Sequence, residues 1–296
     1  MKISRHFFES LSDYQDLIPV LKKAGIPYRT LLNPADEPYL LVFDIIVDSP
    51  EWKIFVDEFP KHLSFPNSSA QMIFDEKEVE SARWLAMFCR LEKDVACEDL
   101  EGITFSAAPC RHTCVQIDDY RFKCKVIWGR SHFLMPMNVI DIFVDDLAKD
   151  VMIKEHLSGV DFRPVKKKKT DVIIPNVNQL VSTNILPQGT VIIGQGRVKE
   201  KCEWRGYHQV RYDNGDVKEK LECSVCHKVQ YICDDLYQFK LKREVLEKAS
   251  LDCYTTADRF GMDGQMQWIV SQRFYQVLKA YQMTRSLVFE PVELVD

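Results

Sequence analysis

The chain has 296 residues, of which 46% are hydrophobic and 28% charged, and its net charge is −5. This near-average globular composition argues against disorder, and the acidic balance argues against a surface that follows nucleic acid phosphates. The first 30 residues carry charges throughout, so no signal segment is expected. The most apolar stretch, residues 39–47, contains Asp44 and is too short to span a membrane. We therefore expect a cytoplasmic protein with no membrane or direct nucleic acid partner.

Residues 77–91 are predicted to form a helix, because Val79, Ala82, Ala86 and Cys89 fall on one helical face. Residues 103–128 are predicted to form strands with turns. The ten cysteines of the chain are expected to be reduced, since nothing indicates secretion. They are therefore buried thiols, metal ligands or reactive groups.

The first cysteine pair is Cys110 and Cys114, whose CxxxC spacing is looser than the CxxC of common zinc sites. Three further residues of metal-binding type lie nearby: Cys97, His112 and Cys124. The alternative interpretation is a pair of buried free thiols.

Residues 141–165 are predicted to form a strand–helix–strand unit. Asp145 is expected to cap a helix over 147–157, and Gly159 suits a left-handed helix end. Pro164 is expected to stop the second strand. The basic run 166–169 that follows is interpreted as a solvated linker.

The second half begins with predicted strands over 171–194. Asn214-Gly215 then predicts a hairpin, because Asn-Gly suits a type I′ turn. The pair Cys223 and Cys226 follows with CxxC spacing, which favours a zinc site completed by two more ligands. Candidates for those ligands are Cys202, His208, His227 and Cys233. A vestigial or structural cysteine pair and a redox pair are the alternatives, as is one zinc site shared by Cys110, Cys114, Cys223 and Cys226.

Residues 267–292 repeat the pattern of residues 141–165. Ser271 is expected to cap a second helix, on which Phe274, Val277, Leu278 and Tyr281 are predicted to form one apolar face. Pro291 is expected to stop the strand that follows. The match aligns Leu147 with Phe274, Val151 with Leu278, Phe162 with Phe289, and Pro164-Val165 with Pro291-Val292. The alternative is a chance likeness of two amphipathic helices with Pro-ended strands.

These elements predict an α/β (α+β) fold of two related halves, residues 1–168 and 169–296. Each half would contain a mixed sheet with helices and a cysteine-pair turn before its strand–helix–strand unit. No HExxH, P-loop or GxSxG motif occurs, so the chain is predicted not to be an enzyme. An enzyme with an unrecognised site stays the third alternative.

Several segments resemble immunity proteins of bacterial polymorphic toxin systems, including the group with paired CxxC motifs. The resemblance covers about residues 70–296 and is carried by residues 74–85, Cys110 and Cys114, Trp128-Gly129, Phe143-Val144, residues 158–165 (SGVDFRPV), Cys223 and Cys226, and residues 288–292. The chain departs from the pattern by its CxxxC spacing and by lacking a Gly after Cys226.

The resemblance implies a protein that binds and neutralises one bacterial toxin in the cytosol. The acidic balance would suit a basic, nuclease-type toxin domain. The acidic stretch 44–58, with Trp52 and Phe55, is a candidate part of the binding face, and an amphipathic surface helix is its alternative. The alternative function is a zinc-stabilised adaptor or regulatory binding module without catalytic activity.

Overall fold

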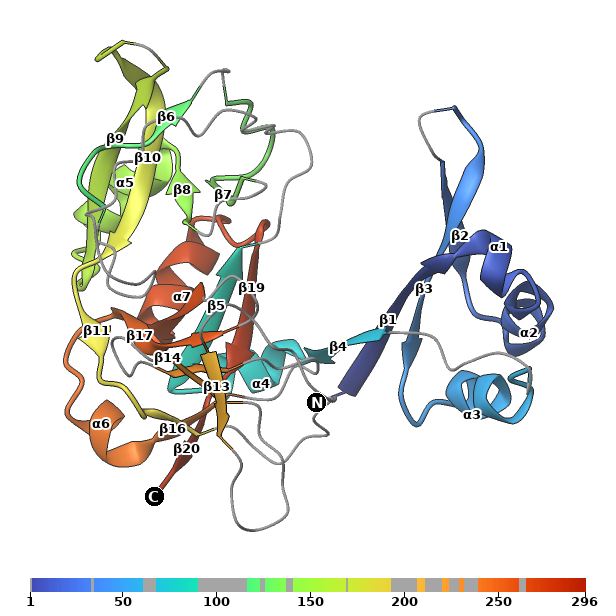
Figure 1. The fold of residues 1–296 in the computed structure, drawn as a ribbon. Helices are drawn as coiled ribbons and strands as arrows, with labels where there is room; N and C mark the ends of the chain where they lie inside the picture. Colours follow the sequence, from blue (N-terminus) through green and yellow to red (C-terminus); the bar gives the residue numbers. More distant parts are fainter. Residues whose placement is uncertain are drawn as a thin grey trace. The chain divides into compact units, whose positions relative to one another are not determined.

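The computed structural model describes residues 2–32, 35–60, 68–89, 116–122, 126–136, 141–168, 170–192, 207–210, 220–223, 229–231, 239–260 and 265–296. They divide into two compact units: unit 1 ends at Glu78 and unit 2 begins at Val79 (Figure 1). Helices and mixed sheets are both present, which confirms the predicted α+β class.

Unit 1 contains a four-stranded antiparallel sheet of order β2-β3-β1-β4. Its elements are β1 (Lys2–Ser10), α1 (Leu11–Tyr14), α2 (Leu17–Ala24), β2 (Tyr28–Leu32), β3 (Pro38–Ile46), α3 (Pro50–Asp57) and β4 (Ser68–Ile73). In Figure 1 the three helices gather on one side of these strands.

Three aromatic side chains form the centre of unit 1. Phe7 and Phe43 lie opposite each other on β1 and β3 and stack with ring centroids 4.7 Å apart. Phe55 of α3 packs 5.7 Å from both rings and is fully buried. The acidic stretch 44–58 is therefore mainly an amphipathic helix packed on the core, and Phe55 is not available to a partner.

The helix predicted over 77–91 is wrong beyond its first turns. Helix α4 (Glu76–Ser81) starts with a capping box, in which Asp75 and Glu78 each accept the other's backbone N–H at 2.8 Å. The chain then enters β5 (Trp84–Cys89), which pairs on both sides. A strand that is buried on both faces has a continuous run of apolar residues in its sequence. Hydrophobic periodicity cannot distinguish such a run from a buried helix.

Unit 2 contains the remaining elements. They are β5, β6 (Arg121–Phe122), β7 (Phe133–Leu134), β8 (Phe143–Val144), α5 (Asp146–Lys154), β9 (Val160–Lys167), β10 (Ile173–Ser182), β11 (Ile185–Leu186), β12 (Val191–Ile192), β13 (Tyr207–Val210), β14 (Lys220–Cys223), β15 (Val229–Tyr231), β16 (Lys240–Lys242), α6 (Arg243–Glu247), β17 (Cys253–Phe260), β18 (Gln265–Ser271), α7 (Gln272–Ala280), β19 (Leu287–Pro291) and β20 (Glu293–Val295).

The described strands of unit 2 form two larger sheets and one small one. One sheet has the order β6-β9-β10-β8-β7, and the other has the order β13-β14-β15-β17-β18-β5-β19, with β11 added beside β17. Strands β12, β16 and β20 form the small sheet. The predicted strands over 171–194 are confirmed by β10, β11 and β12, and β13 pairs antiparallel with β14 as the hairpin prediction required.

The two strand–helix–strand units are present as β8–α5–β9, the first crossover, and β18–α7–β19, the second crossover. Asp145 and Ser271 cap the two helices as predicted, accepting the N–H of Ala148 at 2.8 Å and of Phe274 at 3.1 Å. Pro291 ends β19, but Pro164 does not end β9, which continues to Lys167.

The described part of the basic run, residues 166–168, is not a free linker. Lys166 and Lys167 belong to β9, which turns back into β10, and Lys166 lies 3.0 Å from the carboxylate of Asp119. The predicted halves, residues 1–168 and 169–296, were defined by an internal repeat of the sequence. The two compact units are a different division of the chain, which falls between Glu78 and Val79.

Gly159 has a left-handed backbone, with φ of +85°, but does not end helix α5. The helix ends at Lys154, and His156 takes the left-handed position after it, with φ of 51°. Gly159 is instead pressed against the backbone of Cys253, where a Cβ would overlap the carbonyl oxygen. This close approach joins the start of β9 to the start of β17.

We expect Gly159→Ala to destabilise unit 2 more than Gly189→Ala. Both glycines have positive φ, so each alanine costs about 1–2 kcal/mol of backbone strain. Gly189 has open space around it, whereas Gly159 would also have to move Cys253. Urea unfolding of the two variants measures the difference. Equal losses of stability would show that the contact between residues 159 and 253 is not tight.

Candidate functional site

The predicted cysteine site falls almost wholly outside the described residues. Cys110, Cys114, Cys202, Cys226, His227 and Cys233 all lie there, as do Cys97, His112 and Cys124. Cys223 is the last residue of β14, and its antiparallel partner strand β15 begins at Val229. The CxxC pair thus starts at the end of a paired strand. In the described ranges, no three His, Cys, Asp or Glu side chains come together as a metal-binding group.

The described residues do form a polar junction between the two crossovers, centred on the buried carboxylate of Asp252. Its Oδ2 accepts hydrogen bonds from the N–H and the hydroxyl of Ser158, at 3.0 and 2.9 Å. Its Oδ1 accepts from the Ser271 hydroxyl at 2.9 Å. Ser158 begins the SGVDFRPV segment that carries the resemblance, and Ser271 caps α7, so one carboxylate ties the first crossover to the second.

The guanidinium of Arg273 adds a second link at the same place. It donates to Asp252 Oδ2 at 2.6 Å and also to the backbone carbonyls of Glu155 and His156, where α5 ends. A cation at free C-terminal carbonyls is favourable because of their negative partial charge. Burial would raise the pKa of Asp252, but the hydrogen bonds from Ser158 and Ser271 and the charge of Arg273 together lower it.

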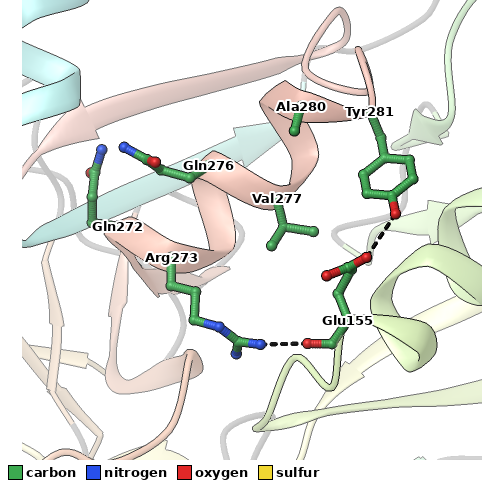
Figure 2. A pocket seen from close by; sticks show the side chains of 7 residues that line it. All are labelled: Glu155, Gln272, Arg273, Gln276, Val277, Ala280 and Tyr281. Carbon is green, nitrogen blue, oxygen red and sulfur yellow. Dashed lines mark hydrogen bonds between the residues drawn. The ribbon is translucent and has the colours of Figure 1, made fainter.

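Beside this junction lies an open hollow of about 540 Å³. Figure 2 shows Val277 pointing into the space between Arg273 and Glu155, with Tyr281 at the far end. The residues that line it are Glu155, Gln272, Arg273, Gln276, Val277, Ala280 and Tyr281. Its floor is thus the small apolar side chains of α7, and its rim is polar.

The rim is held in place by contacts of its own. The Tyr281 hydroxyl donates to Glu155 Oε1 at 2.7 Å (Figure 2). The ammonium of Lys154 donates to the same hydroxyl at 3.2 Å. Arg273 is fixed by Asp252 and the end of α5. Because Arg273 is already paired with Asp252 and Glu155 already accepts a hydrogen bond from Tyr281, the hollow is better suited to an uncharged side chain than to a charged ligand.

Part of this hollow belongs to the apolar face predicted for α7. Phe274 and Leu278 are fully buried as predicted, but Val277 is only half-buried and Tyr281 is 37% exposed. Tyr275 takes the remaining buried position on α7 and meets Phe289 edge to face at 5.0 Å. Helix α7 thus carries more apolar residues than the core buries, and this excess in the sequence indicates an exposed apolar strip on the helix. Nothing in the sequence indicated the roles of Asp252 and Arg273.

Glu290 is a second unusual group, on β19, the last described strand of the large sheet. It lies on β19 opposite Ala86 of β5, which in turn lies opposite Ile269 of β18. Directly opposed side chains share a face, and Ala86 and Ile269 belong to an apolar cluster. Glu290 is 3% exposed, and its Oε2 has no hydrogen-bond partner within the described residues. Burial raises the pKa of Glu290 to about 7.

Glu290→Gln should stabilise the protein at pH 8 more than at pH 5. The Glu290 carboxyl ionises near pH 4.5 when unfolded and near 7 when folded, so it increasingly favours the unfolded state as pH rises through this window. The full effect, present above pH 7, is on the order of 3 kcal/mol. Urea unfolding at both pH values, with exposed Glu247→Gln as the control, measures it. A gain that does not grow with pH would mean that Glu290 has a partner for its charge.

The chain was compared with protein-family models and with curated proteins. Neither a protein-family model nor a curated protein matches the chain. Over the stretches that the structure describes, no helix is long and apolar enough to cross a membrane.

Proposed function

We propose that this protein is an immunity-type inhibitor that binds a cognate bacterial toxin in the cytosol and neutralises it by stoichiometric association. The resemblance of residues 158–165 and 288–292 to immunity proteins suggests the class of partner. The hollow on α7 is the observation that carries the proposal, because it offers a preformed site for an inserted side chain. No residue is required to perform chemistry in this account.

The occupant of the hollow is an aliphatic or aromatic side chain of the toxin. Protein interfaces concentrate their binding energy in such anchors, which fill pockets with fixed walls. The paired rim of Glu155, Arg273 and Tyr281 lowers the cost of binding, because those side chains are already ordered. Val277 and Ala280 then gain an apolar partner.

The rest of the interface must lie around the hollow. Nanomolar inhibition corresponds to about −12 kcal/mol, and an interface of ordinary size buries roughly 1,600 Å² in total. The net charge of −5 favours encounter with a basic toxin domain such as a nuclease.

Co-expression with the toxin domain encoded beside this protein tests the proposal. The unaltered protein should rescue growth and co-elute with the toxin in a defined complex. Ala280→Arg should lower affinity at least about tenfold, because it fills the hollow from an exposed position on α7 without entering the core. Ile153→Arg, at a 54% exposed site on α5, is the matched control and should bind normally.

Two failures are distinguishable. If the unaltered protein neither rescues growth nor forms a complex, the immunity proposal is wrong. If it does both and Ala280→Arg behaves like Ile153→Arg, the inhibitor binds its toxin through another face.

A zinc-stabilised adaptor or regulatory binding module is the second candidate. It is favoured by the position of Cys223, at the end of a strand whose antiparallel partner begins six residues later at Val229. A CxxC over such a connection can supply two thiolate ligands of a tetrahedral zinc site. The other two would be Cys110 and Cys114, or two of Cys202, His208, His227 and Cys233.

This candidate predicts about one zinc per chain by elemental analysis, and less after Cys223→Ser. Zinc content should fall at acidic pH, because the thiolates must lose protons to bind. Zinc-free protein with an unchanged melting temperature in Cys223→Ser would exclude a structural zinc at this pair.

A further inference from the structure

The two crossovers of unit 2 share an unusual topology. In each, the two parallel strands are separated by a third strand that runs antiparallel to both: β10 lies between β8 and β9, and β5 lies between β18 and β19. Each first strand also pairs antiparallel with the strand before it, β7 with β8 and β17 with β18. The four-strand orders are therefore β7-β8-β10-β9 and β17-β18-β5-β19.

The strand registers of these two sheets coincide residue for residue. In the first sheet, Asn178 of the middle strand lies opposite Val144 on one side and Pro164 on the other. In the second sheet, Leu85 of the middle strand lies opposite Val270 and Pro291 in the same way. One residue further along, Gln179 lies opposite Phe143 and Arg163 in the first sheet. The corresponding Ala86 lies opposite Ile269 and Glu290 in the second sheet. A slip of one residue would turn every side chain to the other face, so this agreement is a strong constraint.

The starts of the two helices are tied down in the same way. The backbone N–H of the cap Asp145 donates to the carbonyl of His132 at 3.2 Å, and that of the cap Ser271 donates to the carbonyl of Asp252 at 2.8 Å. The cap side chains meet the same residues: Asp145 Oδ2 lies 2.8 Å from His132 Nδ1, and the Ser271 hydroxyl donates to Asp252. His132 and Asp252 each stand directly before β7 or β17.

The ends of the helices also match. His156 and Gln282 are both left-handed, and the next N–H donates back to Met152 or Leu278 at 2.9 or 2.8 Å. These matching caps and ends align α5 with α7 one residue away from the alignment predicted from the sequence. Leu147, predicted to match Phe274, is 55% exposed, and buried Ala148 is the equivalent position.

We infer that these two sheets are copies of one ancestral module that have exchanged their middle strands within the chain. In chain order the first copy is β5, β7, β8, α5 and β9, and the second is β10, β17, β18, α7 and β19. Each copy begins with the strand that lies in the middle of the other copy's sheet. The groove between the parallel strands of each crossover is thus a strand-binding site whose occupant is the first strand of the other copy.

The exchange means that neither copy closes its own sheet. Residues 1–168 supply β5 to the second sheet, and residues 169–296 supply β10 to the first. The predicted junction at residues 168 and 169 joins two interleaved copies, and the Asp252 junction fastens them together a second time.

Paired cysteine substitutions in the full chain test the exchange. Ala86→Cys with Ile269→Cys places thiols at directly opposed positions, within reach of a disulfide. Ala86→Cys with Phe143→Cys is the matched variant, because residue 86 would lie opposite residue 143 if the copies kept their own strands. A specific protease site inserted after Lys168 then separates the fragment containing residues 86 and 143 from the fragment containing residue 269.

After oxidation and cleavage, the 86/269 variant should run as one covalently linked species without reductant, whereas the 86/143 variant and the unsubstituted parent should run as two fragments. The cleaved parent should also stay together on native size exclusion. A covalent link inside the first fragment of the 86/143 variant, or fragments of the parent that separate under native conditions, would overturn the exchange.

Discussion

The carboxylate of Asp252 is the interaction on which the described arrangement of unit 2 depends. It is 8% exposed and accepts hydrogen bonds from the loop before β9, from the cap of α7 and from Arg273. A buried charge with several donors is favourable only while all of them stay in place, because removing one leaves a desolvated group unpaired. The close approach of Gly159 to Cys253 fixes the same loop from the other side. Together these contacts set the distance between the end of α5 and the start of α7.

That distance creates the hollow. Arg273 donates to both Asp252 and the last carbonyls of α5, so its side chain forms one side of the hollow. Glu155 and Tyr281 close the opposite side through their own hydrogen bond. The contacts that join the two crossovers thus also shape the hollow, with Val277 and Ala280 as its apolar floor.

The sequence predicted the elements whose signals are local. Both helix caps, the α5 and α7 helices, the β13–β14 hairpin and the Pro291 strand end follow from short-range patterns and agree with the structure. The errors arose where tertiary pairing decides. Residues 84–89 form a central strand because β18 and β19 lie on either side of it, and Gly159 is needed by a contact with a residue 94 positions away. Neither fact can be read from neighbouring residues.

The candidate site was harder to predict than the fold. The cysteines proposed as metal ligands lie outside the described residues apart from Cys223, while the junction of Ser158, Asp252 and Arg273 has no spacing pattern. Only the excess of apolar residues on α7 pointed toward the hollow, since two of them had no place in the core.

Hydrogen–deuterium exchange with and without the bound toxin tests the central claim most directly. The account predicts that binding slows amide exchange over residues 272–281 and at the end of α5, because the toxin side chain closes the hollow above these turns. Unchanged exchange over residues 272–281 in a saturated complex would contradict it, as would the absence of any complex.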